Sequence, residues 1–143
     1  MVTGLDIVQE QIRIAAGKKL EFSQKDIVLR GHSIECRINA ECPETFIPSP
    51  GKITAYHAPG GTGVRLDSAA YNDCVVSPHY DSLIAKLISH GTTRSEALAR
   101  LNRALDMFII EGIQTSIPLH QKIINHPQFI EGNLGISFLD QME

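Results

Sequence analysis

His32-Ser-Ile-Glu-Cys-Arg-Ile-Asn-Ala-Glu41 alternates apolar and polar side chains along its length. In a β-strand, successive side chains point to opposite faces of the sheet. The apolar set that shares one face is Ile34, Cys36 and Ile38. The polar set on the other face is Glu35, Arg37 and Asn39. The stretch therefore predicts a strand with one buried and one polar face, around which the rest of the chain folds.

Arg37 is the least expected residue in this strand. Its guanidinium stays charged and offers a planar fork of donors, which suits a carboxylate, a phosphate or a similar anion. Held from behind by an apolar layer, it is a candidate anion-binding residue. The alternative is a solvated strand face on which Arg37 pairs locally with Glu35, and such surface pairs contribute little stability. The strand pattern alone leaves both interpretations open.

Composition limits the classes of protein to consider. The 143 residues are 43% hydrophobic and 20% charged, with a net charge of −3 and no basic block. A nucleic-acid-binding protein needs a concentrated Lys/Arg face, so we expect no nucleic-acid partner. No run approaches the ~18 apolar residues that span a bilayer, and the first residues do not resemble a signal peptide. We therefore expect a cytoplasmic domain that does not enter a membrane.

The cysteines and histidines do not form a recognisable metal site. Cys36, Cys42 and Cys74 lack CxxC spacing, and we expect reduced thiols. Cys36, beside Arg37, is either a reactive thiol of lowered pKa or a small buried apolar residue, and the second is the more common case. The six histidines form no HExxH pattern, so we expect no metal bound by this chain alone.

The order of elements predicts an α+β fold. Strand-like runs separated by turn residues occupy residues 27–30, 33–40, 52–57, 63–67, 73–76 and 82–90. Their close spacing favours antiparallel pairing, because parallel crossovers need a dozen or more residues. The sequence thus predicts a mainly antiparallel sheet flanked by helices.

Helical patterns lie at both ends of the chain. Residues 3–16 predict an amphipathic helix with Thr3 as N-cap and Gly17 as the stop. Thr93-Arg-Ser-Glu96 matches a capping box, followed by an apolar stripe at helical spacing: Leu98, Leu101, Leu105 and Phe108. Residues 109–115 look extended around Gly112, and 116–125 predict a further helix.

Three other motifs invite functional interpretations. Pro59-Gly-Gly-Thr-Gly63 lacks the spacing of a phosphate loop and is better explained as a turn between strands. Arg65 and Asp67 share a strand face, either as a surface pair or as a contact to another subunit. Asp81 stands where a strand starts and suits a turn cap, and Lys86 either extends its charge to solvent or pairs with an acid such as Asp81.

Taken in order along the chain, these stretches resemble the biotin carboxylase family from end to end. The matching segments are residues 3–8, 30–41, 46–54, 58–61, 63–65, 79–82, 86–88 and 110–113. Phe46-Ile-Pro-Ser-Pro-Gly-Lys-Ile-Thr54 is similar to the bacterial-type subunit of acetyl-CoA carboxylase. The resemblance covers only the C-terminal third of that enzyme, and it implies the fold of the biotin carboxylase C-terminal domain.

The resemblance also implies a domain organisation. Residues 1–20 correspond to the last helix of the ATP-grasp region, the rest of which is missing here, and residues 21–143 correspond to the C-terminal domain. Met1 matches an internal methionine of the family, so we expect it to be an internal residue of a longer enzyme. In the family, the ATP-binding and metal-binding residues lie in the ATP-grasp domain, outside the segment that this chain matches. We therefore expect this chain to be inactive alone.

The activity implied is that of an ATP-dependent ligase. Biotin carboxylase uses ATP, Mg²⁺ (or Mn²⁺) and bicarbonate to carboxylate biotin on biotin carboxyl carrier protein, the first step of acetyl-CoA carboxylation in fatty acid synthesis. By resemblance, Arg37 contacts bicarbonate and stabilises the biotin enolate. A fixed cation beside a developing oxyanion lowers a barrier electrostatically. From their place on the same strand face, we predict that Glu35 and Asn39 hold Arg37.

Further residues gain roles only through the resemblance. Ile136 matches a residue that packs on the adenine of ATP. Arg65 and Asp81 match positions at the homodimer interface, and Thr62 stands where some relatives carry an aromatic interface residue. Cys42 replaces a common Asp in a turn, and we expect little catalytic effect from it.

The implied partners are the missing ATP-grasp domain, the carrier protein, the carboxyltransferase subunits and a second copy of the enzyme. Two other functions stay open. The chain could be a non-catalytic interaction domain that docks a biotin carrier protein. It could also be the equivalent part of a propionyl-CoA, methylcrotonyl-CoA or pyruvate carboxylase. A third hypothesis, an unrelated anionic ligand held by Arg37, applies only if the resemblance is coincidental.

Overall fold

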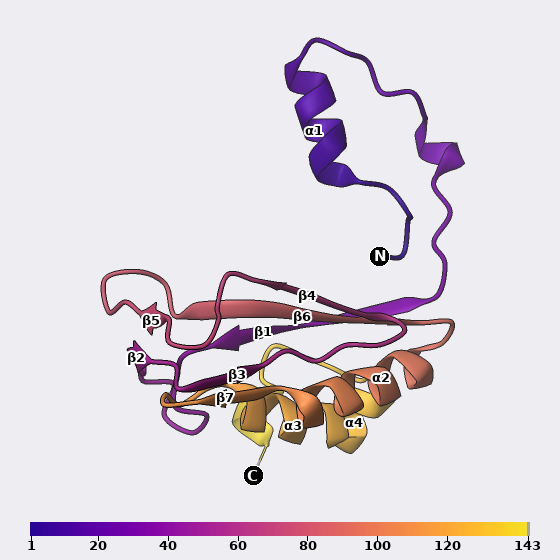
Figure 1. The fold of residues 1–143 in the computed structure, drawn as a ribbon. Helices are drawn as coiled ribbons and strands as arrows, with labels where there is room; N and C mark the ends of the chain where they lie inside the picture. The colour runs from indigo at the N-terminus through magenta and orange to yellow at the C-terminus, as the bar shows by residue number, and fades with distance from the viewer. Residues whose placement is uncertain (143) are drawn as a thin grey trace.

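A three-stranded antiparallel sheet forms the centre of the protein. The structure is a computed structural model that describes residues 1–142. The sheet has the order β1 (His32–Asn39), β6 (Leu83–Gly91) and β4 (Val64–Ser68). Figure 1 shows it as a layer with α2, α3 and α4 on one side and α1 on the other. The predicted α+β class and the antiparallel pairing are confirmed.

The two long strands carry the predicted alternation. β1 and β6 pair so that Cys36 lies opposite Leu87 and Ile38 opposite Ala85. Cys36 is 3% exposed and Ile38 is fully buried, whereas Arg37 between them is exposed. The sheet therefore has one apolar face toward the core and one face open to solvent.

Helix α2 (Arg94–Met107) covers the apolar face, packing on β6 and β1. Its predicted stripe is buried, and Leu101 and Leu105 are 0% and 1% exposed. Burying a side chain of this size contributes about 1.5–3 kcal/mol. The stripe therefore accounts for much of the attachment of the helix to the sheet.

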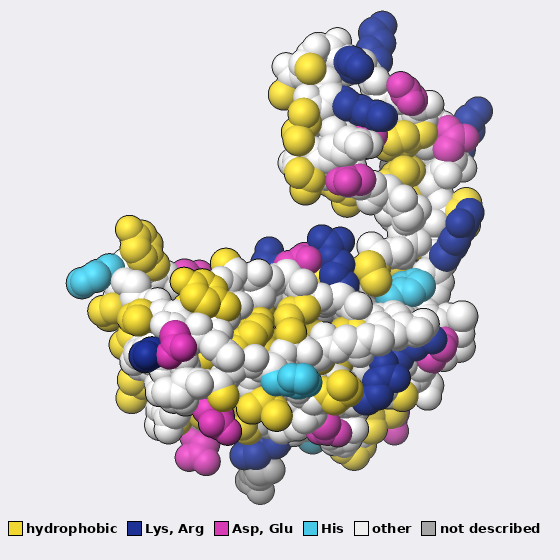
Figure 2. All heavy atoms as spheres, in the orientation of Figure 1, with side chains coloured by type: hydrophobic (Ala, Val, Ile, Leu, Met, Phe, Trp, Pro, Cys, Tyr) yellow, Lys and Arg dark blue, Asp and Glu magenta, His cyan; other side chains and the backbone are white. Residues whose placement is uncertain are grey.

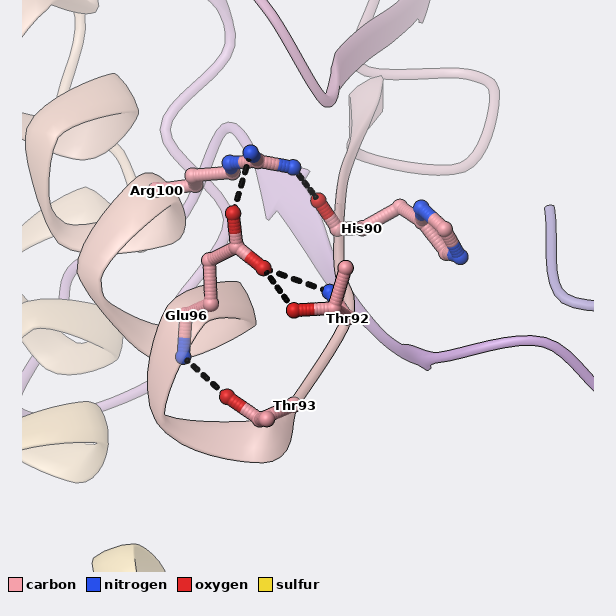
Figure 3. A network of polar contacts seen from close by, with 5 residues as sticks. All are labelled: His90, Thr92, Thr93, Glu96 and Arg100. Carbon is pink, nitrogen blue, oxygen red and sulfur yellow. Dashed lines mark hydrogen bonds and ion pairs between the residues drawn. The ribbon is translucent and has the colours of Figure 1, made fainter.

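The junction between β6 and α2 is held by a polar network (Figure 3). The Thr93 side chain accepts a hydrogen bond from Glu96 N, so the predicted N-cap is confirmed. The Glu96 carboxylate does not complete the box at Thr93. It accepts instead from the Thr92 amide (2.6 Å) and hydroxyl (2.5 Å), which lowers its pKa, and it pairs with Arg100. Arg100 also donates to the His90 carbonyl (2.6 Å), which fastens the end of β6 to the helix.

The run predicted as one strand over residues 52–57 is two short strands in different sheets. β2 (Gly51–Lys52) pairs with β5 (Val75–Val76), and β3 (Ala55–His57) pairs with β7 (Ile109–Glu111). Ile53, fully buried, donates to Cys74 O, while the next amide donates to the carbonyl of Glu111. The chain changes hydrogen-bonding partner at Ile53, and this change was not visible in the sequence.

Two other boundaries differ from the prediction. Residues 27–30 are not a strand: Leu29 is 73% exposed, and Arg30 N donates to Val2 O (2.8 Å) rather than to a neighbouring strand. The helix expected from residue 3 is α1 (Ile7–Ala15), and its N-cap is Asp6, which accepts from Gln9 N (2.9 Å). The Thr3 cap is wrong because Gly4 takes a positive φ of 71° and interrupts the helical path.

The remaining helices follow β7 in the sequence. They are α3 (Ile117–Asn125), close to the predicted range, and α4 (Pro127–Glu131), which was not predicted. Short 3-10 turns occupy Gln24–Asp26 and Leu139–Gln141. Within residues 1–142 no helix is long and apolar enough to cross a membrane.

α1 differs from the other helices because it packs on little else. Figure 1 shows it standing away from the sheet. All nine of its residues are at least partly exposed, and its apolar side chains are more than half exposed: Ile7, Val8, Ile12 and Ile14. It ends at Ala15, just before the predicted stop at Gly17, which has a φ of 77°. An amphipathic helix in this state presents an apolar face that nothing within residues 1–142 covers.

Leu101→Ala should lower the free energy of unfolding by about 2–5 kcal/mol, because it leaves a cavity where α2 meets the sheet. Urea unfolding followed by circular dichroism measures the change. Leu29→Ala is the matched control, since Leu29 is exposed, and it should change stability by less than about 0.5 kcal/mol. Equal effects of the two substitutions would contradict the packing described here.

Candidate functional site

Arg37 lies on the open face of the central sheet. The residues before and after it are buried against the core, which fixes the direction in which its Cα–Cβ bond points. Figure 2 shows basic and acidic side chains along the sheet surface that faces α1. The predicted division of β1 into an apolar and a polar face is confirmed, with Glu35 also exposed.

Lys86 stands directly beside Arg37. The β1–β6 register pairs the two residues, and Lys86 is exposed. Directly opposed residues of an antiparallel pair have Cβ atoms about 5 Å apart, and like charges there are unfavourable. Neither cation takes part in an ion pair among the residues that the structure describes. Two neighbouring cations that form no ion pair with the described residues are an arrangement that an anionic ligand would stabilise.

The third strand adds a carboxylate to this row. Asp67 lies opposite Lys86 in the β4–β6 register and accepts a hydrogen bond from Arg65 Nε at 2.9 Å. This bond, and the charges of Arg65 and Lys86, hold the pKa of Asp67 below its usual range. The predicted surface pair between Arg65 and Asp67 is therefore present. Because both side chains are largely exposed, the pair contributes little stability.

Among residues 1–142, neither polar neighbour on β1 forms a hydrogen bond or an ion pair with the Arg37 guanidinium. No ion pair joins Glu35 to Arg37 within residues 1–142, so the local pair considered from sequence is absent. The side-chain amide of Asn39 donates from Nδ2 to Glu41 Oε1 at 3.1 Å. The supporting role expected of Glu35 and Asn39 stays a prediction, and it does not rest on a direct contact.

The expected interface residues lie at two separate places. Arg65 pairs with Ile88 near the end of β6, and Thr62 is exposed in the turn that precedes β4. Asp81 precedes the start of β6, about 20 Å along the strand from Arg65. The Asp81 carboxylate accepts a hydrogen bond from Leu83 N at Oδ1 (3.1 Å), which confirms the turn cap. The alternative, an ion pair with Lys86, is absent among the described residues.

Ile136 lies far from the sheet in sequence and is fully exposed, at 110% relative exposure. A large apolar side chain in that state is available to a ligand or to another segment of protein. No group of three or more His, Cys, Asp or Glu residues suited to a metal ion occurs among the described residues.

Cys36 is a core residue. Burial, and to a lesser degree the Glu35 charge, raises the pKa of its thiol to about 12. The thiol is therefore protonated at neutral pH, which excludes the reactive-cysteine interpretation and confirms the apolar one.

Lys86 is the site residue whose position the sequence did not reveal. Its strand was predicted, but its neighbour depends on the register between strands distant in the chain. The alternation of β6, with Ala85 and Leu87 buried, was the available signal that Lys86 belongs to the polar face.

Comparison with known proteins gives consistent results. Residues 35–141 match the biotin carboxylase C-terminal domain. The chain is 52% identical over 141 residues to biotin carboxylase of Pseudomonas aeruginosa, covering 99% of this chain and 31% of that protein. It is also 52% identical over 142 residues to a pyruvate carboxylase component of Methanothermobacter thermautotrophicus, covering 99% and 29%.

Among solved structures, the chain resembles the biotin carboxylase domain dimer of Hydrogenobacter thermophilus 2-oxoglutarate carboxylase, in complex with MgADP, ADP and bicarbonate. The TM-score is 0.96 and the identity 46%, over 99% of this chain and 31% of that one. The predicted fold type is confirmed. The chain spans about a third of the length of the relatives it matches.

Iodoacetamide at pH 8 should label Cys42 but not Cys36 in the native protein. The raised pKa leaves Cys36 as thiolate in about one molecule in ten thousand, and the residue is also buried. Cys42 is partly exposed, and a hydrogen bond from the Thr45 side chain lowers its pKa. Peptide mass spectrometry distinguishes the two sites, and both should react in urea. Rapid labelling of native Cys36 would contradict its place in the core.

Proposed function

Since the chain belongs to the biotin carboxylase C-terminal domain family, we propose that it forms the C-terminal part of a biotin carboxylase. This enzyme would use ATP and bicarbonate to carboxylate the biotin of a carrier protein. The observation that carries the proposal is Arg37, a cation without an ion-pair partner among residues 1–142, on the open sheet face of a chain similar to a bicarbonate-bound relative.

In this mechanism Arg37 acts through its charge. Carboxylation of biotin passes through species in which negative charge develops on oxygen, and a cation already in position stabilises that charge without reorganising. Lys86, opposite Arg37, adds a second positive charge to the same surface. The remaining wall of the pocket would come from the ATP-grasp part of the enzyme.

The division of the chain follows from the same proposal. Residues 1–20 would be the last helix of the ATP-grasp region, and residues 21–143 the C-terminal domain. The exposed apolar face of α1 supports this assignment, because a helix embedded in a larger domain needs such a face. The family match begins at residue 35, beyond α1.

ATP and Mg²⁺ (or Mn²⁺) would be held mainly outside this chain. The described residues contain no metal-binding cluster, so the metal ligands would come from the ATP-grasp part. Ile136 is the one contact proposed here, and its full exposure would allow it to pack on the adenine ring. Bound ATP would supply the phosphoryl group that activates bicarbonate.

The enzyme would work as a homodimer with further partners. Arg65, Asp81 and Thr62 are exposed, as interface residues of a separate subunit would be. The solved domain dimer of the Hydrogenobacter thermophilus relative supports this part of the proposal. Biotin carboxyl carrier protein and carboxyltransferase subunits would complete the assembly.

For the wider pathway we favour acetyl-CoA carboxylation in the cytoplasm, the first step of fatty acid synthesis. Several curated relatives are biotin carboxylases, including that of Pseudomonas aeruginosa. A pyruvate carboxylase is the second candidate, because the Methanothermobacter pyruvate carboxylase component is equally identical at 52%. Assaying the complete enzyme with separate carboxyltransferases for acetyl-CoA and pyruvate would decide between them.

Arg37→Ala in the complete enzyme should slow biotin carboxylation about 10²- to 10³-fold, because a cation at the developing oxyanion is lost. Biotin-dependent ADP release with bicarbonate measures the rate. Arg103→Ala, which removes an exposed arginine on α2, is the control and should keep the normal rate. Near-normal turnover of Arg37→Ala would remove Arg37 from the mechanism.

The 143-residue chain alone should not cleave ATP in a bicarbonate-dependent manner. The proposed metal site, and the proposed ATP site apart from Ile136, lie in the part of the enzyme that the chain does not contain. Coupled detection of ADP tests this, with the complete enzyme as the positive control. Bicarbonate-dependent cleavage by the purified chain would contradict the proposed division of labour. Tight binding of a biotin carrier by the chain, with an inactive complete enzyme, would favour the docking-domain alternative.

A further inference from the structure

The outer edge of β1 is closed by the start of α3. In the order β1–β6–β4, β1 is an edge strand, so alternate backbone groups point away from its partner. Two hydrogen bonds join Asn39 to Ser116 across this edge. The backbone N–H of Asn39 donates to Ser116 Oγ (3.0 Å), and the backbone N–H of Ser116 donates to Asn39 O (3.0 Å).

The carbonyl of Arg37 accepts two hydrogen bonds at the same edge. One comes from Ser116 Oγ (3.1 Å) and the other from His120 Nε2 (2.8 Å). A carbonyl can only accept, so His120 must carry its proton on Nε2. Ser116 is 7% exposed, and its hydroxyl uses its single proton toward Arg37 while it accepts from Asn39. Both lone pairs of the Arg37 carbonyl are thereby occupied.

These contacts occur beside an irregularity in the pairing of β1 with β6. The β1–β6 register shifts between Ile38 and Asn39, directly after Arg37. The extra residue is Ile84 of β6, so the ladder is disrupted locally opposite Ile38 and Asn39 before Ala40 N donates to Ser82 O (2.8 Å). The α3 side of the edge therefore supplies the restraint that the ladder loses at this point.

His120 is suited to donate the hydrogen bond to the Arg37 carbonyl permanently. Burial lowers the pKa of its imidazole, although the hydrogen bond to Arg37 opposes that change. The ring is therefore neutral at physiological pH, with Nε2–H directed at the carbonyl. No change of charge is needed for the contact to persist, since the protonated ring would also donate from Nε2.

We infer that His120 and Ser116 are positioning residues that hold the Arg37 backbone, and so fix where its guanidinium meets the reacting oxyanion. The inference rests on the proposed function. They do not touch the substrate themselves. Their effect would be geometric, because displacement of a catalytic group by about 1 Å can reduce a rate by up to 10².

The experiment compares two substitutions in the complete enzyme. His120→Met keeps the volume but removes the donor, whereas His120→Gln places an amide N–H near the position of Nε2. We expect His120→Met to lower kcat/KM for bicarbonate about three- to tenfold, the range for loss of one hydrogen bond, with KM for ATP within twofold of normal. His120→Gln should restore bicarbonate kinetics to within about twofold.

Amide hydrogen exchange provides a readout that does not depend on activity. The Asn39 amide, which donates to Ser116, should exchange about three- to tenfold faster in His120→Met and at the normal rate in His120→Gln. Ser116→Ala, which removes the shared hydroxyl, should accelerate the same amide further. Thermal unfolding of each variant separates a local effect from global loss of structure.

The outcomes separate the inference from the proposed function. A complete enzyme without biotin-dependent carboxylation would refute the proposed function and the inference with it. An active enzyme in which Arg37→Ala is impaired, but His120→Met keeps normal bicarbonate kinetics and normal Asn39 exchange, would overturn the inference alone. A comparable rise in KM for ATP, or failure of His120→Gln to restore activity, would also overturn it.

Discussion

Packing of β1 and β6 on α2 is the interaction on which the rest of the structure depends. Ile38 and Leu87 are fully buried beneath the helix, and their burial determines which way every second side chain of each strand points. Arg37 and Lys86 therefore face solvent for the same reason that their neighbours do not. Burial of the apolar side chains on one face of the sheet thus directs the charged side chains between them to the opposite, solvent-facing side. A shift of one residue in either strand would exchange the two faces and bury the cations.

The charged face is held at its margins as well as from below. The polar network of Thr92, Glu96 and Arg100 ties the end of β6 to α2. The start of α3 closes the outer edge of β1. Individually, such hydrogen bonds contribute about 0.5–1.5 kcal/mol. Their larger effect is to restrict the end of β6 and the outer edge of β1.

Local sequence patterns predicted most of the elements but not their pairing. The alternation around Cys36 and the capping sequence at Thr93 predicted β1 and the start of α2, because both depend on residues close in the chain. The neighbours of Lys86 could not be predicted, since they follow from the register of strands far apart in sequence. The break at Ile53 was missed for the same reason. The role proposed for Arg37 came from resemblance to a family, while the alternation gave only the direction of its side chain.

The short connection between β6 and α2 also bears on the order in which the protein folds. Only Thr92 and Thr93 separate the two elements, so they can meet at little cost in chain entropy. β1, in contrast, pairs with β6 only after β2 to β5 have been synthesised. Non-local pairings of this kind slow folding. During synthesis the apolar side of β1 therefore stays without its partner strand until β6 leaves the ribosome, and exposed apolar surface of this kind promotes aggregation.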